Sequence, residues 1–222
     1  MIKVKNVCLQ LNQQSILSDI SLEINRGQCL GIMGPSGAGK TSLLKVLAQL
    51  IKPSSGNVIY EAPIQSAFVF QNANLLKNKN VLQNALLPIK KTPDSINKAL
   101  NLLNDFGLNE MTKKYPAQLS SGQQQRLAII RALMQEPNII FFDEPTANLD
   151  SGVVLDTLNI LKRLNEQHQT TLVMVTHDVA VAKFLFDQVL WLADGKIVRL
   201  DNVKKINDLN SGYLSIWEEL YD

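Results

Sequence analysis

The sequence of 222 residues predicts an α/β protein, with a mostly parallel β-sheet flanked by helices, an N-terminal antiparallel β-subdomain and an inserted helical subdomain. Three observations predict this fold. A glycine-rich loop lies between a short apolar strand and a helix-like segment. The apolar run from Ile139 to Phe142 is typical of a strand that is buried on both faces of a parallel sheet. From there to Phe186, strand and helix patterns alternate, as in a parallel sheet covered by helices.

Composition narrows the class of protein. Hydrophobic residues make up 45% of the chain and charged residues 19%, as in ordinary globular proteins. The net charge of +2 is small and evenly spread, so we expect no nucleic-acid partner. The start of the chain has no features of a signal peptide, and no apolar run approaches the ~18 residues of a membrane span. If the protein works at a membrane, we expect the membrane-spanning part to be another chain.

The first part of the chain reads as β-structure that leads into the glycine-rich loop. Residues 2–33 alternate between apolar and polar side chains, as antiparallel or mixed strands do. The loop then matches G-x-x-x-x-G-K-[ST], with an apolar strand at 29–33 before it and helical spacing at 42–51 after it. The residues expected to bind nucleotide phosphates are Gly34, Pro35, Ser36, Gly37, Ala38, Gly39, Lys40, Thr41 and Ser42.

The residue types of this loop suit phosphate chemistry. Its glycines permit backbone angles closed to other residues, so that successive N–H groups can converge on phosphate oxygens. The start of the following helix adds a favourable dipole. Lys40 can reach the β- and γ-phosphates, and the Thr41 hydroxyl can bind Mg²⁺. The sequence therefore predicts the core of a P-loop nucleoside triphosphatase.

The middle of the chain changes from strands to helices. Short strands are expected at 58–60 and 68–70, and helical spacing dominates 81–118, with Gly107 as a stop signal. A further helix follows Leu119. We predict a single domain, with the core and its β-subdomain in 1–80 and 119–200, the helical subdomain at about 81–118, and a tail at 201–222.

Two carboxylates follow the apolar strand that ends at Phe142. Ligands of open α/β sheets bind at the carboxyl ends of the strands, where Asp143 and Glu144 lie. Asp143 would hold Mg²⁺ beside the Thr41 hydroxyl. Glu144 would polarise the water that attacks the γ-phosphate.

The order of motifs resembles the ATP-binding subunits of ABC transporters over nearly the full length. Five motifs match, namely the phosphate loop, Gln71 after an apolar strand, Leu119-Ser120-Ser121-Gly122-Gln123, Asp143-Glu144, and His177. The first and fourth fit many nucleoside triphosphatases, whereas the segment at 119–123 singles out this family. The expected activity is ATP hydrolysis.

The resemblance implies a homodimer, or a heterodimer with a paralogue, that clamps two Mg·ATP head to tail and drives a separate transmembrane permease. The phosphate loop of one subunit would face Ser120, Ser121, Gly122, Gln123 and Asp150 of the other. Gln71 would reach the metal and the attacking water, and His177 would contact the γ-phosphate and orient Glu144. The implied location is cytoplasmic, peripheral at the inner face of the cell membrane.

Two positions depart from the family pattern. Leu11 stands where the family usually has an aromatic residue that stacks on adenine, which puts base selectivity in doubt. Ser121 replaces the first glycine of the usual Leu-Ser-Gly-Gly-Gln, and its side chain would have to fit beside the γ-phosphate of the partner.

The type of transporter is left open by the sequence. The short 56–71 stretch is similar to that of small-solute importers, whereas 144–150 is similar to that of lipoprotein-release and macrolide-efflux proteins, which we favour slightly. Two rival functions are a non-transport ATPase of DNA repair or chromosome organisation, and a catalytically weak regulatory partner. ATPases of DNA repair or chromosome organisation contain a long coiled coil, for which this sequence has no pattern. A catalytically weak partner is disfavoured because the set of catalytic residues is complete. Apolar residues of the tail predict a short amphipathic helix that packs on its own domain.

Overall fold

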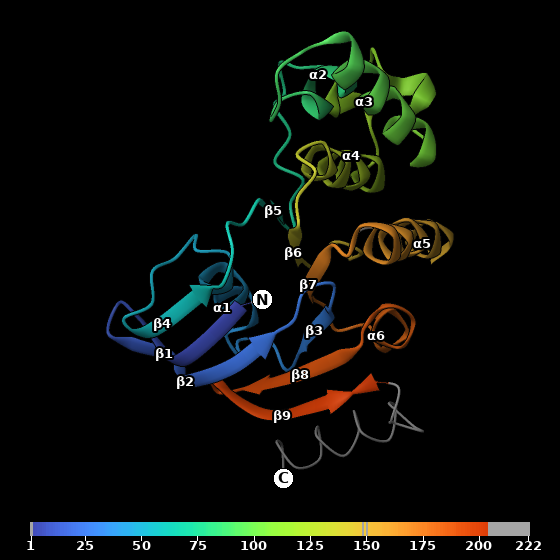
Figure 1. Ribbon diagram of the computed structural model, residues 1–222. Helices are drawn as coiled ribbons and strands as arrows, with labels where there is room; N and C mark the ends of the chain where they lie inside the picture. The colour runs from blue at the N-terminus through green and yellow to red at the C-terminus, as the bar shows by residue number, and fades with distance from the viewer. Residues whose placement is uncertain (1, 148, 150, 204–222) are drawn as a thin grey trace. The chain divides into compact units, whose positions relative to one another are not determined.

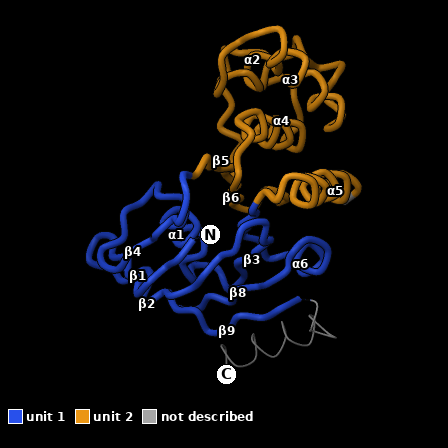
Figure 2. The backbone as a smooth tube through the Cα atoms, viewed as in Figure 1, with its two compact units in different colours: residues 1–63, 171–222 blue, residues 64–170 orange. Residues whose placement is uncertain are grey.

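The computed structural model describes residues 2–147, 149 and 151–203, which form two compact units. Among the described residues, unit 1 comprises 2–63 and 171–203, and unit 2 comprises those between 64 and 170 (Figure 2). The predicted tail helix and Asp150 lie outside the described residues. No helix in the described part of the chain combines the length and apolarity needed to cross a membrane.

The first sheet of unit 1 is antiparallel, which is one of the two arrangements expected for residues 2–33. It contains β1 (Ile2–Leu11), β2 (Gln14–Ile24) and β4 (Ser55–Tyr60) in the order β2-β1-β4 (Figure 1). The β1–β2 hairpin turns at Asn12 and Gln13, whose φ angles of 48° and 67° are typical of a tight type I′ turn.

The second group of strands in unit 1 is mixed. β3 (Cys29–Met33) pairs in parallel with both β7 (Thr171–Val175) and β8 (Gln188–Ala193). β9 (Lys196–Asn202) closes the predicted antiparallel hairpin with β8. Every residue of β3 and β7 is buried, because a parallel sheet is covered on both faces.

Two helices of unit 1 follow β3 and β7. They are α1 (Lys40–Leu47) and α6 (Val179–Leu185). The apolar spacing predicted a helix over 42–51, but α1 begins two residues earlier and ends at Leu47. It ends there because Gln49 adopts a left-handed φ of 58°, after which Leu50 is exposed.

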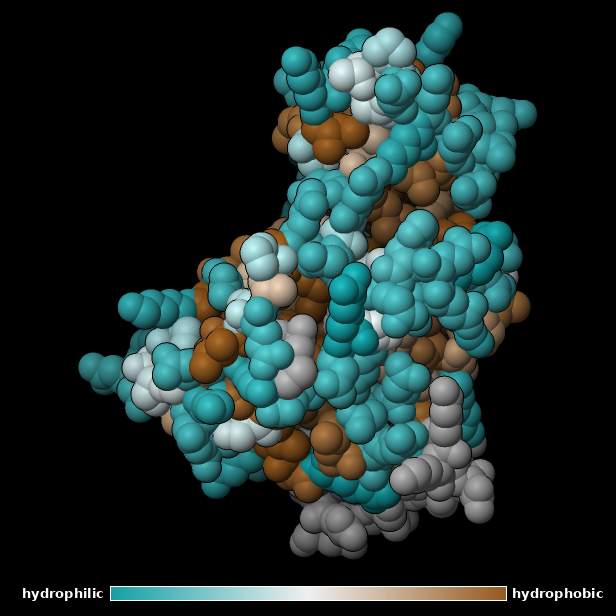
Figure 3. All heavy atoms as spheres, viewed as in Figure 1, coloured by the Kyte–Doolittle hydropathy of each residue, from teal (hydrophilic) through white to brown (hydrophobic). Residues whose placement is uncertain are grey.

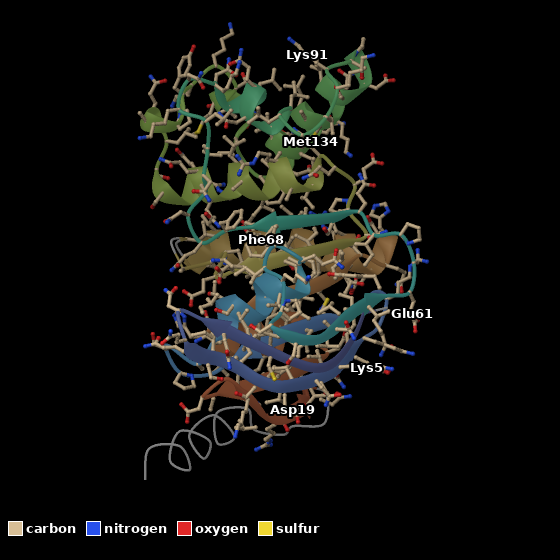
Figure 4. The ribbon with its side chains drawn as sticks, turned by 90° about the vertical axis from the view of Figure 1, so that its left-hand side faces the viewer. Lys5, Asp19, Glu61, Phe68, Lys91 and Met134 are labelled. Atoms are coloured by element: carbon tan, nitrogen blue, oxygen red, sulfur yellow. The ribbon has the colours of Figure 1, made fainter. Side chains whose placement is uncertain are left out.

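Unit 2 contains the predicted helical segment and one pair of parallel strands. The strands are β5 (Ser66–Val69) and β6 (Ile139–Asp143), and Phe68, labelled in Figure 4, stacks on Phe141 with ring centroids 6.5 Å apart. The helical elements are α2 (Val81–Ala85), α3 (Pro93–Asp105), η1 (Asn109–Met111), η2 (Pro116–Gln118), α4 (Ser121–Leu133) and α5 (Ser151–His168).

Local signals explain where α3 lies. Thr92 and Ser95 form a capping box at its start, and Pro93 occupies its first turn. Gly107, the predicted stop, has a left-handed φ of 64° just beyond its end.

Candidate active site

The phosphate loop of unit 1 joins β3 to α1. Its glycines Gly34, Gly37 and Gly39 have φ angles of 143°, 81° and 96°, which explains why the sequence places glycine there. Gly39 is the residue before α1, and its carbonyl accepts the first helical bond from Leu43 N at 2.8 Å. The first-turn N–H groups of α1 therefore point toward the loop, and a helix start of this kind favours anions.

Lys40 places its ammonium group at this loop. Nζ donates to the carbonyl oxygen of Gly34 at 2.9 Å and to that of Pro35 at 2.6 Å. The side chain thus folds back over the loop that precedes it, and its charge lies beside the same turn as the helix start. A cation and a row of N–H groups together suit a polyphosphate.

His177 shares a sheet edge with the phosphate loop. The loop follows β3 and His177 comes just after β7, and these parallel strands pair Ile32 with Val175. Thr176 N donates to Ile32 O at 3.3 Å, which extends the pairing to the residue before His177. Because the carboxyl ends of parallel strands meet at one edge, the structure brings His177 and the loop to the same side of unit 1.

A second group of predicted residues meets in unit 2. β5 and β6 are parallel and pair Val69 with Phe142, so Gln71 and Glu144 leave the strands at the same edge. Gln71 Nε2 donates to Glu144 Oε2 at 3.4 Å. Asp143, the last residue of β6, is 7% exposed. Glu144 has a left-handed φ of 48°, uncommon for a residue with a side chain and typical of functional sites.

The segment at 119–123 forms the start of α4. Ser120 caps the helix, because its Oγ accepts from Gln123 N at 3.2 Å. Gln123 Oε1 in turn accepts from Ser120 N at 3.0 Å, which completes a capping box. Ser121 and Gly122 are the first two residues of α4. The side chains of Ser120 and Gln123 thus serve their own helix, and they present its N-terminus at the surface.

The structure adds residues that sequence reasoning missed. Gln125 and Asn84 are buried polar side chains of unit 2. Gln125 donates to the carbonyl oxygen of Phe70, just before Gln71, and Asn84 donates to that of Leu76, further along the chain. Their signal in the sequence was a polar residue at an apolar-facing helical position. By contrast, Leu11, at the position usual for an adenine-stacking residue, is 41% exposed at the end of β1.

Comparison with known proteins shows which family has this arrangement of residues. A family model described as ABC transporter matches residues 17–147. The chain is 39% identical to the probable amino-acid import ATP-binding protein YxeO of Bacillus subtilis (strain 168), over 94% of this chain and 92% of that protein. It is 38% identical to the bacitracin export ATP-binding protein BceA of Halalkalibacterium halodurans, over 87% of this chain and 83% of that protein.

Solved structures agree with the family model. The dimeric post-hydrolysis state of the ATP-binding cassette MJ0796, bound to ADP and Pi, matches with a TM-score of 0.86 and 33% identity, over 93% of this chain and 100% of that one. The expected α/β fold with a P-loop core is thereby confirmed. The chain belongs to the ABC transporter family. It is an ATP-binding subunit of that family, and its enzymatic activity is ATP hydrolysis.

Proposed function

We propose that two copies of this chain, or one copy and a paralogue, clamp two Mg·ATP head to tail and drive a separate transmembrane permease from the cytoplasmic face of the cell membrane. The observation that carries the proposal is the phosphate loop, with glycines in left-handed conformations before α1 and Lys40 folded over them. Dimeric structures of an ATP-binding cassette related to this chain support the assembly.

Nucleotide binding falls to residues 34–42. The backbone N–H groups of the loop and of the first turn of α1 hold the phosphates, and Lys40 exchanges its two carbonyl partners for phosphate oxygens. The hydroxyl of Thr41 and the carboxylate of Asp143 fit Mg²⁺, because this ion takes one or two protein oxygens and completes its shell with water and phosphate. The amide oxygen of Gln71 is a third candidate ligand. When bound, Mg²⁺ neutralises charge on the β- and γ-phosphate oxygens.

Hydrolysis rests on Glu144 and its neighbours. The Glu144 carboxylate accepts a proton from the attacking water, and Gln71, already bonded to Glu144 Oε2, orients the carboxylate and the water. His177 acts from the strand edge that also bears the phosphate loop, where it donates to a γ-phosphate oxygen. Catalysis is then mainly positioning and electrostatic stabilisation.

The second subunit completes each site. The start of α4 offers backbone N–H groups and a positive dipole end to the γ-phosphate bound by its partner. Ser121, as the first residue of that helix, faces the same phosphate in this arrangement, and its hydroxyl supplies one more donor in place of the usual glycine. Asp150 would contact the partner subunit beside this site.

Glu144→Gln tests both the chemistry and the clamp. The amide cannot accept the proton, so we expect ATP to remain bound while turnover falls by roughly 10²–10⁴-fold. Size-exclusion chromatography with light scattering should show a monomer that becomes a dimer on addition of Mg·ATP. Lys40→Ala in the same background is the matched control and should stay monomeric. Near-normal turnover of Glu144→Gln would refute the role assigned to Glu144, and a persistent monomer with ATP bound would refute the homodimer.

We further propose amino-acid import as the first transport function to test. Its support is the relative from Bacillus subtilis, which matches this chain over nearly the full length of both proteins. Peptide export is the second candidate, supported by the bacitracin exporter at almost the same identity. Vesicles that contain the chain together with a candidate permease would decide. ATP-dependent uptake of labelled amino acids would support import, and ATP-dependent release of bacitracin would support export. Glu144→Gln should abolish whichever transport is observed.

A further inference from the structure

The segment from Phe70 to Asn80, here called the Gln71 loop, has little regular structure of its own. It runs from the end of β5 to the start of α2, and Gln71 is its second residue. Asn74 within it adopts a left-handed φ of 48°. A conformation of this kind persists only where surrounding contacts hold it.

Two side chains of α4 supply those contacts at the start of the loop. Gln125 Nε2 donates to Phe70 O at 3.0 Å. The Arg131 guanidinium donates through Nη2 to Ala73 O at 2.9 Å and through Nη1 to Asn74 O at 2.8 Å. A planar fork of this kind holds two successive carbonyl groups through two separate nitrogen atoms in a fixed geometry, whereas a lysine has only one freely rotating ammonium group.

Gln125 belongs to the packed interior, and Arg131, on the same helix, is half-buried. Gln125 is 2% exposed, and burial lowers the pKa of the Arg131 guanidinium. A buried donor that loses its acceptor leaves an unsatisfied group, so the bond from Gln125 to Phe70 O resists rupture. In Figure 4, Phe68 marks β5, which leads into the loop, and Met134 marks the residue that follows α4.

The far end of the loop is held separately. Asn84 on α2 accepts from Leu76 N at 2.9 Å and donates to the carbonyl oxygens of Leu76, Lys79 and Asn80 at 2.8–3.1 Å. Both ends of the loop are therefore anchored. The residues near Gln71 depend on α4, whose other end is the capped segment at Ser120.

We propose that Arg131, assisted by Gln125, is a positioning residue for ATP hydrolysis: it holds the Gln71 loop on α4, so that Gln71 follows the segment at 119–123 when that segment engages ATP. The inference rests on the catalytic role proposed for Gln71. α4 is a single helix from Ser121 to Leu133, so a displacement of its start is carried along its length to Arg131. Gln71 and its bond to Glu144 would then respond to the partner subunit's nucleotide.

A double-mutant cycle on the full-length protein tests this. Arg131→Lys keeps the charge but loses the fork, and we expect it to lower kcat by roughly ten- to hundredfold, with little change in the KM for ATP, because misplacement affects the chemical step. In the Gln71→Ala background, Arg131→Lys should change kcat by less than about twofold, since the residue it positions is gone.

Arg126→Lys is the matched control. It lies on the same helix and also bonds a backbone carbonyl, but this carbonyl, Phe106 O at 2.6 Å, belongs to the residue after α3 and not to the Gln71 loop. Its effect on kcat should be the same with and without Gln71. If Arg131→Lys fails to fold, Gln125→Met, which removes the donor to Phe70 O and keeps the shape, takes its place in the cycle.

Equal losses from Arg131→Lys in both backgrounds would overturn the proposal, as would unchanged turnover of Gln71→Ala. Failure of the wider function is distinguished by Glu144→Gln. If that variant loses turnover while the Arg131–Gln71 cycle is additive, the proposed catalysis stands and the positioning role does not.

Discussion

At the phosphate loop, the space around one atom decides which residue is tolerated. A Cβ on Gly34 would lie 2.0 Å from the carbonyl oxygen of Leu192, a contact that no side chain survives without a shift of the backbone. A Cβ on Gly37 would meet no atom within 4 Å, so there only the left-handed φ of 81° opposes a side chain.

Gly34→Ala and Gly37→Ala should therefore differ in cost. We expect Gly37→Ala to lower the free energy of unfolding by about 1 kcal/mol, the cost of a left-handed conformation for alanine. Gly34→Ala adds a backbone clash and should cost roughly 3 kcal/mol. Urea denaturation of both variants measures the difference, and equal costs would contradict the packing of the loop against β8.

Lys40 is a second residue whose atoms define its role. Since Nζ already lies among the loop carbonyls, Lys40→Ala should weaken ATP binding by roughly 10- to 100-fold, the scale of a charged hydrogen bond. Lys45→Ala, in the last turn of the same helix, is the matched control and should bind ATP as the parent does. Titration calorimetry compares them, and unchanged affinity of Lys40→Ala would count against the phosphate loop.

Among the elements, β4 and α1 are joined by a hydrogen bond from the half-buried side chain of Tyr60. Tyr60, the last residue of β4, donates through its OH to the carbonyl oxygen of Leu47, the last residue of α1. Burial raises the pKa of Tyr60 from 10.0 to about 12. The folded state therefore prefers the neutral phenol, while the unfolded chain ionises near pH 10.

Because the pKa of Tyr60 is higher in the folded state than in the unfolded chain, stability depends on pH in the alkaline range. The contribution of Tyr60 is fully present below pH 10 and is lost as the pH rises from 10 to about 12. Tyr60→Phe should cost about 1 kcal/mol at neutral pH, through the lost hydrogen bond, and should flatten the alkaline decline. Denaturant midpoints at several pH values check this. An equally steep decline in Tyr60→Phe would show that another group is responsible.

At the scale of the whole molecule, we expect the ATPase activity to depend on the association of two subunits. The face seen in Figure 3 carries its hydrophobic residues in several separate groups among hydrophilic ones. Monomeric proteins commonly expose scattered hydrophobic residues of this kind. In the proposed clamp, the two copies are held together by the ATP bound between them rather than by a large hydrophobic surface.

The turnover per subunit should accordingly rise with protein concentration and then level off, because in the proposed clamp only the dimer has complete sites. Removal of Mg²⁺ with a chelator should stop turnover at every concentration. Steady-state ATPase assays over a hundredfold range of protein concentration test this, with Lys40→Ala as the background control. A constant specific activity over that range would contradict the need for a second subunit.

The local features of this protein follow from short stretches of its sequence. The spacing of glycines and of Lys40, the apolar strand before Asp143 and the stop at Gly107 each depend on a few neighbouring residues, so a single sequence predicts them. The boundaries of α1 were less well predicted, because the left-handed turn at Gln49 has no glycine to signal it.

Contacts between residues far apart in the chain could not be predicted in this way. The fork of Arg131 on the Gln71 loop and the bond from Gln125 to Phe70 join residues more than fifty positions apart, and neither side chain belongs to a motif. The close approach of Leu192 to Gly34 is of the same kind. The pattern of neighbouring residues indicates the local preference of the backbone. These contacts depend instead on how strands and helices pack, and that packing is determined by the whole chain.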